Sequence, residues 1–289
     1  MKKILLTAMV LTLSAMFSNA QDGLYTIKNG NITMTVNANE AGKIVSLKYG
    51  DKEVLSQLAR PNAYGSTFWT SPQKEWNWPP VPAHDMLPDL TFQFGDRLVC
   101  AGQLSEQFPI RIIKTFYADP KDGSIVIEYT AKNDSDIERT IAPWEITRVP
   151  NGGMVFYDAP VESIWPDDLM KYTSAYGLSW YLAEQYKNYR KTNADAKGWI
   201  AYVNEGLLFV KCFEDIPAGA PAPGEAEVQL YVHNGKTYFE LEGQGAYTAL
   251  KPGESLTWKC KWFLVPVDAW DAPSAELAKT ARRLGNSKL

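Results

Sequence analysis

Residues 238–265 alternate apolar and polar side chains with a period of two, which is the strongest constraint on the fold. In the first half of this segment, Phe239 and Leu241 alternate with Glu240 and Glu242; the second half repeats the pattern after a Pro-Gly pair. Such alternation is typical of strands with one buried face, and Pro-Gly suits the turn between them. The segment therefore predicts two antiparallel strands, one of which carries two carboxylates on the same face.

The rest of the chain is also rich in strand signals. Strands are predicted at 24–35 (with Asn29-Gly30 as a hairpin turn), 44–49, 53–55, 91–94, 98–101, 110–118, 124–133, 140–149, 154–157, 199–204, 207–213, 227–233, 236–244 and 255–265. No linker or repeat divides these segments, so the pattern indicates an all-β, single-domain antiparallel sandwich.

Helix is predicted in one place, residues 272–284. Asp271 is a suitable N-cap, Pro273 fits the first turn, and Gly285 follows the last apolar position. The aromatic-rich segment 167–191 is predicted to be a long loop with at most one helical turn.

The N-terminus has the pattern of a secretory signal peptide. Lys2 and Lys3 precede a mostly apolar run over residues 4–17, and small residues follow, so cleavage is expected after Ala20. The run is shorter than the apolar stretch that a membrane-spanning helix normally needs. The expected organisation is a signal peptide at 1–20 and one domain at 21–289, without a membrane span in the mature chain and located in the periplasm or outside the cell.

Charge, cysteine and histidine content narrow the function further. The net charge is −4 and no basic cluster is present, which argues against nucleic acid as a partner. Cys100, Cys212 and Cys260 fit either three buried thiols or one disulfide with one free thiol. The only histidines, His84 and His233, lack metal-ligand spacing. No metal, phosphate-binding loop or cofactor is predicted.

Residues 64–80 contain three tryptophans and three prolines. This composition predicts a stiff loop without regular structure. A tryptophan offers a broad apolar face and an N–H donor, which suits stacking against a sugar ring. Trp69, Trp76 and Trp78 are therefore candidates for a binding wall, the alternative being that they close one end of the core.

Two C-terminal motifs resemble the galactose mutarotase-like (aldose 1-epimerase-like) superfamily. They are Leu241-Glu242-Gly243-Gln244 and the turn Leu250-Lys251-Pro252-Gly253-Glu254-Ser255. The resemblance implies a β-supersandwich over most of the mature chain, with Glu242 as the general base. The tryptophan segment is similar to a secreted branch of that superfamily, mostly of undescribed function, through Gly65, Trp69 and Pro72 and then Trp78-Pro79-Pro80.

Residues 141–153 depart from the superfamily pattern. Mutarotases carry a catalytic histidine on the strand in this region, and this chain has none there; Glu145 stands roughly where that histidine would be. Alternation places Glu145 on one face and Trp144 and Arg148 on the other. Arg148 is expected either to bind an anionic group of a sugar or to form an ion pair.

The two histidines complete the candidate set. His233, in a turn before Glu242, fits a proton donor that works with Glu242, and the alternative is a solvent-exposed turn histidine. His84 follows the tryptophan segment and is the other possible acid or a sugar contact, with a structural role as the alternative.

These residues predict an exported carbohydrate-binding protein. An acid–base step at the anomeric carbon, as in an aldose 1-epimerase-like isomerase, is one interpretation, with Glu242, His233 and Glu145 as candidate catalytic residues. Three alternatives stay open: a non-catalytic glycan-binding protein, a polysaccharide lyase or glycosidase, and a structural envelope protein.

Overall fold

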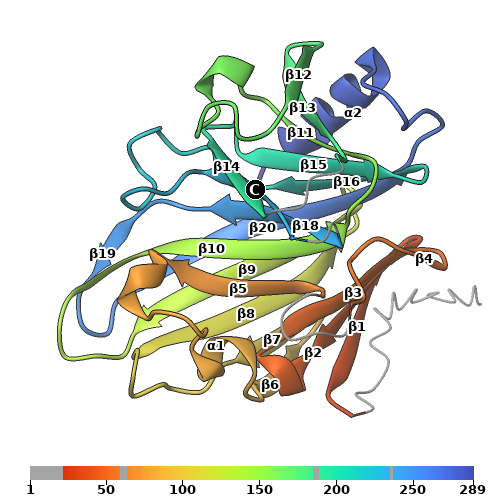
Figure 1. The fold of residues 1–289 in the computed structure, drawn as a ribbon. Coiled ribbons are helices and arrows are strands. Elements are labelled where there is room, and N and C mark those ends of the chain that lie inside the picture. Colours follow the sequence, from red (N-terminus) through yellow and green to blue (C-terminus); the bar gives the residue numbers. More distant parts are fainter. Residues whose placement is uncertain (1–21, 59–63, 185–188, 235–236) are drawn as a thin grey trace, which may run out of the picture.

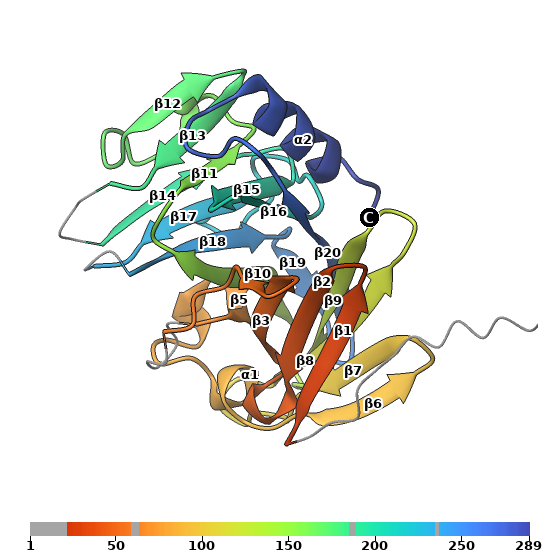
Figure 2. The same ribbon diagram turned by 90° about the vertical axis from the view of Figure 1, so that its right-hand side faces the viewer.

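The computed structural model describes residues 22–58, 64–184, 189–234 and 237–289 and shows two stacked antiparallel sheets (Figures 1 and 2). The signal peptide predicted for residues 1–20 lies outside the described residues. None of the helices in the described part of the chain has the length and apolar character that a membrane crossing needs.

The first sheet has the strand order β1-β2-β3-β5-β10-β18-β17-β14, with β4 beside β3 and β19 beside β10. Its strands are β1 (Leu24–Asn29), β2 (Ile32–Asn37), β3 (Lys43–Tyr49), β4 (Lys52–Glu53), β5 (Ser66–Ser71), β10 (Arg139–Pro150), β14 (Arg190–Ala194), β17 (Val228–Val232), β18 (Tyr238–Gln244) and β19 (Thr248–Leu250).

The second sheet has the order β12-β13-β11-β15-β16-β20-β9-β8-β7-β6. Its strands are β6 (Leu90–Phe94), β7 (Arg97–Ala101), β8 (Ile110–Asp119), β9 (Ser124–Asn133), β11 (Met154–Tyr157), β12 (Tyr172–Ala175), β13 (Leu178–Leu182), β15 (Trp199–Asn204), β16 (Leu207–Cys212) and β20 (Ser255–Pro266).

The helical elements are short. They are α1 (Pro82–Asp85), α2 (Ala275–Gly285) and the 3-10 turns η1 (Ala38–Glu40), η2 (Gln73–Glu75) and η3 (Val161–Ser163). The main core lies between the sheets, and a second apolar cluster lies between α2 and the strands around β15 and β16.

The predicted all-β fold is confirmed, and the alternation in residues 238–244 has the expected result. Phe239 and Leu241 of β18 are buried in the main core. Because neighbouring side chains of a strand point to opposite faces, Glu240 and Glu242 point away from the second sheet. Cys100, Cys212 and Cys260 are buried free thiols, the first of the two alternatives.

The tryptophan segment is only partly a loop, contrary to the prediction. Its first part forms β5, a strand in the interior of the first sheet that pairs with β10 and is buried along its whole length. A strand covered on both faces shows no alternation, which explains why the pattern was missed. The irregular structure begins at Pro72, after the end of β5.

Two other predictions were wrong in detail. The segment 167–191 contains the hairpin of β12 and β13, whose turn residues Tyr176 and Gly177 both have positive φ. That turn is a hairpin signal that sequence reading missed. The C-terminal helix begins at Ala275 rather than 272, because the side chain of Ser274 accepts a hydrogen bond from the Leu277 amide and so caps the helix.

Candidate functional site

A pocket of about 410 Å³ lies on the face of the first sheet that is turned away from the second sheet. Strands β5, β10, β14, β17 and β18 and the segments next to them contribute its wall. The lining residues are Trp69, Gln73, Trp78, Trp144, Arg148, Lys191, Tyr231, His233, Tyr238, Glu240 and Glu242.

Two ion pairs line the pocket. The Nε of Arg148 lies 2.9 Å from Oε1 of Glu240, and the Nζ of Lys191 lies 2.8 Å from Oε2 of Glu242. Strand register explains the proximity, because Arg148, Glu240, Tyr231 and Lys191 are consecutive cross-strand partners on β10, β18, β17 and β14. Two cations and two carboxylates therefore balance in charge.

Glu242 is almost completely buried although it lines the pocket. Its Oε2 also accepts a 2.7 Å hydrogen bond from Nε1 of Trp144. Burial raises the pKa of the Glu242 carboxyl above its usual value, whereas the ammonium group of Lys191 lowers it and the carboxylate of Glu240 raises it. A carboxyl group with a raised pKa is suited to proton transfer near neutral pH.

Three indoles also line the pocket. Trp69 makes edge-to-face contacts with Trp144 at 5.5 Å and with Trp78 at 6.1 Å between ring centroids. The Nε1 of Trp69 donates to Asp85 of α1 at 3.2 Å, which fixes the orientation of its ring. Trp78 is 61% exposed, so its ring presents a face to solvent.

No family model and no curated protein matches the sequence. Solved structures, in contrast, match the fold over most of the chain. A candidate aldose 1-epimerase from Escherichia coli K12 is 13% identical with a TM-score of 0.60, and the match covers 84% of this chain and 99% of that one. A galactose mutarotase related enzyme from Lactobacillus acidophilus is 10% identical with a TM-score of 0.55 and coverage of 86% and 100%. This chain has the galactose mutarotase-like fold.

A third match covers only half of the other chain. A TPR-domain containing protein from Parabacteroides distasonis is 14% identical with a TM-score of 0.61, and the match covers 88% of this chain but 50% of that one. Identities this low establish the fold alone, and the activity has to be argued from the site.

In this mutarotase-like fold, five of the residues that the sequence suggested lie together in the pocket. They are Trp69, Trp78, Arg148, His233 and Glu242. His233 stacks on Tyr238 with ring centroids 4.5 Å apart, and its Nδ1 lies 2.8 Å from Oγ1 of Thr237.

Glu145 lies elsewhere, in the interior between the sheets. Its carboxylate is fully buried, lies 2.8 Å from Nζ of Lys211 and accepts a hydrogen bond from the hydroxyl of Tyr129. Lys211 also donates to Oγ1 of Thr147 at 2.9 Å. Because odd-numbered residues of β10 point into the core here, Glu145 is on the opposite face from Arg148 and the pocket.

Trp76 and His84 are also separate from the pocket lining. Trp76 is buried behind Trp69, and its Nε1 donates to the carbonyl of Thr70 at 2.8 Å. His84 of α1 is buried, with Nε2 2.7 Å from the carbonyl oxygen of Ile110. Burial lowers the pKa of His84 to about 4, so its ring is neutral at physiological pH.

Sequence reading missed several residues of the pocket. Lys191, Trp144, Tyr231, Tyr238 and Glu240 were not named as site residues, although the shared face of Glu240 and Glu242 was evident from the alternation. Trp144 and Arg148 are separated by an even number of positions, so alternation places them on the same face of the strand, which is a comparable signal.

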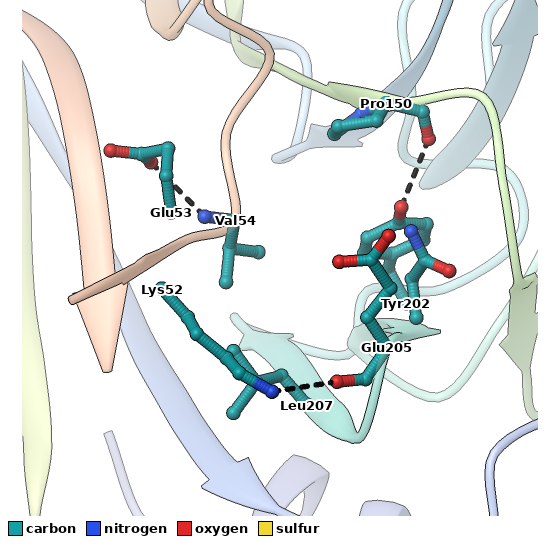
Figure 3. Close-up of a pocket in the computed structure, with 8 residues that line it drawn as sticks. Lys52, Glu53, Val54, Pro150, Tyr202, Glu205 and Leu207 are labelled. Carbon is teal, nitrogen blue, oxygen red and sulfur yellow. Dashed lines mark hydrogen bonds between the residues drawn. The ribbon is translucent and has the colours of Figure 1, made fainter. Parts of the chain in front are cut away.

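Two other hollows in the described structure lack the indoles of this pocket. A hollow of about 100 Å³ lies near β4 and β16 (Figure 3). Across it the hydroxyl of Tyr202 donates to the carbonyl of Pro150 at 2.9 Å, and Nζ of Lys52 donates to the carbonyl of Glu205 at 3.4 Å. A larger hollow of about 440 Å³ is lined entirely by residues between Val161 and Tyr172 and has no tryptophan wall.

One group of carboxylates has the spacing of a cation site. Ligand oxygens of Asp195, Asp215 and Glu227 lie within 4.8 Å of one another. Both oxygens of Glu227 already accept backbone amide hydrogen bonds, from Ala196 at 2.7 Å and from Ile216 at 3.0 Å. These bonds account for the orientation of Glu227 without an ion.

Proposed function

We propose that the chain is an exported carbohydrate-binding protein that holds a sugar ring in the pocket between the indole wall and the Arg148–Glu240 and Lys191–Glu242 pairs. The observation that carries the proposal is one pocket, in a mutarotase-like fold, that combines an exposed Trp78 ring with a buried Glu242 carboxylate. Sugar rings have apolar C–H faces that stack on indoles and hydroxyl edges that need charged or polar partners.

The same pocket is suited to interconversion of the anomers of a sugar. Glu242 would accept the proton of the anomeric hydroxyl while an acid protonates the ring oxygen; the C1–O5 bond breaks, and the open-chain aldehyde closes again on its other face. Lys191 is the cationic group closest to Glu242 in the pocket and the first candidate for that acid, and His233 at the pocket wall is the second.

A non-catalytic binding role is the second candidate. Glu145, which the resemblance to mutarotases suggested as the replacement for their histidine, lies in the core in a buried ion pair with Lys211 and is not available to a ligand in the pocket. In addition, Glu242 is already held by both Trp144 and Lys191. Binding of a free sugar without faster exchange of its anomers, followed by NMR, would favour this role.

Export to the periplasm or the exterior is supported by the signal-peptide pattern of residues 1–20. N-terminal sequencing of the protein recovered from the periplasm or the medium is expected to begin at Gln21. A start at Met1 in the cytoplasmic fraction would contradict export.

A glycan-array measurement tests the carbohydrate proposal. The mature protein is compared with Trp78→Ala, with Glu242→Gln and with Trp165→Ala, the last being a half-exposed tryptophan outside the pocket lining. We expect Trp78→Ala to lose at least tenfold in affinity and Trp165→Ala to bind as the parent protein does. Absence of binding to every saccharide on the array would refute the proposal.

A further inference from the structure

Aromatic surface continues beyond the pocket on the β14 side. Tyr189, which directly precedes β14, is 67% exposed and is not part of the pocket lining. Its ring stacks on that of Tyr231, with centroids 6.2 Å apart and an angle of 24° between the planes. Tyr231 itself lines the pocket, so the exposed face of Tyr189 extends the pocket wall outward.

A second exposed aromatic face lies at the other end of the site. Trp78 projects into solvent and contacts Trp69 of β5 edge to face. Strands β5 and β14 are separated by β10, β18 and β17 in the first sheet (Figure 2). Four strand spacings correspond to about 19 Å. A single pyranose ring is too small to contact both aromatic faces.

The surface between the two aromatic faces carries charged side chains. The Arg148–Glu240 and Lys191–Glu242 pairs lie on β10, β18 and β14, and Trp144 and Tyr238 line the pocket beside them. Consecutive rings of a glycan chain present stacking faces and hydroxyl edges in the same sequence. A long floor of charged and aromatic groups, with an exposed aromatic platform at each end, is therefore complementary to a chain of sugar rings.

We propose that this site takes an oligosaccharide, with one ring at Trp78 and Trp69 and a later ring of the same chain on Tyr189 and Tyr231. The inference rests on the proposed carbohydrate-binding function and adds the substrate class. It assigns Tyr189 as a binding residue that acts only on ligands longer than one ring.

Titration calorimetry with saccharides of increasing length tests this inference. The probes are neutral gluco-, galacto- and manno-configured saccharides of one to four residues, measured on the mature chain. We expect affinity to rise at least tenfold from the monosaccharide to the tetrasaccharide in one series. Tyr189→Ala is expected to remove that gain and leave monosaccharide affinity unchanged. Tyr176→Ala, an exposed tyrosine on the β12–β13 turn, is the control.

The two proposals fail in different ways. Equal affinity for one to four residues, or a length gain that survives Tyr189→Ala, would overturn the oligosaccharide inference and leave the carbohydrate proposal intact. Absence of binding to every probe would contradict both. Because Tyr189 is mostly exposed, its loss is expected to leave the melting temperature nearly unchanged, which a thermal melt of each variant verifies.

Discussion

Nζ of Lys191 lies 2.8 Å from Oε2 of Glu242, so a lysine on β14 neutralises a carboxylate on β18 across the intervening strand β17. The Lys191 ammonium also lies 5.0 Å from the centroid of the Trp144 ring, whose Nε1 donates to the same carboxylate oxygen. Glu242, Lys191 and Trp144 thus form one unit, and the protonation state of Glu242 depends on its two neighbours.

Replacing Lys191 by methionine is expected to raise the pKa of Glu242 further. An opposite charge at this distance lowers a carboxyl pKa, so its loss should shift the midpoint of Glu242 upward. Titration of the carboxyl carbon by NMR measures the shift. Lys191→Arg preserves the charge and should leave the midpoint nearly in place. An unchanged midpoint in Lys191→Met would show that burial alone controls Glu242.

His84 is expected to make the fold less stable as the pH falls below neutral. Burial lowers its pKa from 6.5 to about 4, with opposing effects from the hydrogen bond to the Ile110 carbonyl and from Asp85 and a further lowering from Lys114. Between these values the unfolded chain binds a proton that the folded chain does not, so this contribution is complete above pH 6.5 and is lost as the pH falls toward 4. The full difference corresponds to about 3 kcal/mol.

Urea unfolding at pH 7 and pH 5 of the parent protein, His84→Gln and His233→Gln measures this contribution. His84→Gln should reduce the loss of stability on acidification, whereas His233→Gln, which removes the other histidine, should retain it. Asp89, whose pKa is raised by burial to about 6, acts in the opposite direction over part of this range. The pH dependence of a single protein combines both effects. The contribution of His84 is therefore taken from the difference in unfolding free energy between the variants.

The alternation of apolar and polar residues made much of the fold and part of the site predictable. It placed Glu240 and Glu242 on one face of a strand, and it placed Arg148 and Glu145 on opposite faces of another. Both results are confirmed by the structure. Residues on opposite faces of one strand cannot line the same pocket. The alternation therefore disagreed with the hypothesis, taken from the mutarotase histidine, that Glu145 belongs to the same site as Arg148.

Lys191 was not predictable, because it lies 51 residues from Glu242 and in a segment without a clear pattern. Its position depends on the pairing of β14 with β17, which is a long-range contact with no local sequence signal. The prediction for β5 was also wrong, because the tryptophans and prolines of residues 64–80 suggested a loop. The prolines follow the strand rather than interrupting it.

Trp76 and Trp78 are expected to separate stability from binding. Trp76 is buried against Trp69 and hydrogen-bonded to Thr70, so Trp76→Ala should cost about 3–5 kcal/mol of unfolding free energy. Trp78 is largely exposed, so Trp78→Ala should cost much less and instead weaken glycan binding. Denaturant unfolding and binding measured on both variants test this contrast. A large loss of stability in Trp78→Ala would mean that its ring is structural.

The ion pair of Glu145 and Lys211 is expected to join the two sheets. Glu145 belongs to β10 of the first sheet and Lys211 to β16 of the second, and both side chains are fully buried. Lys211 also donates to the carbonyl of Leu241 at 2.8 Å. Removal of one partner leaves an uncompensated buried charge, so Lys211→Met and Glu145→Leu should each cost about 3–5 kcal/mol.

The double variant distinguishes this ion pair from a simple packing effect. When both charges are removed, no uncompensated charge is left, so Glu145→Leu with Lys211→Met should be clearly more stable than the sum of the single changes predicts. Urea unfolding of the four proteins gives the coupling free energy. Additive losses would mean that the two residues stabilise the fold through separate contacts, such as those of Glu145 with Tyr129 and of Lys211 with Thr147.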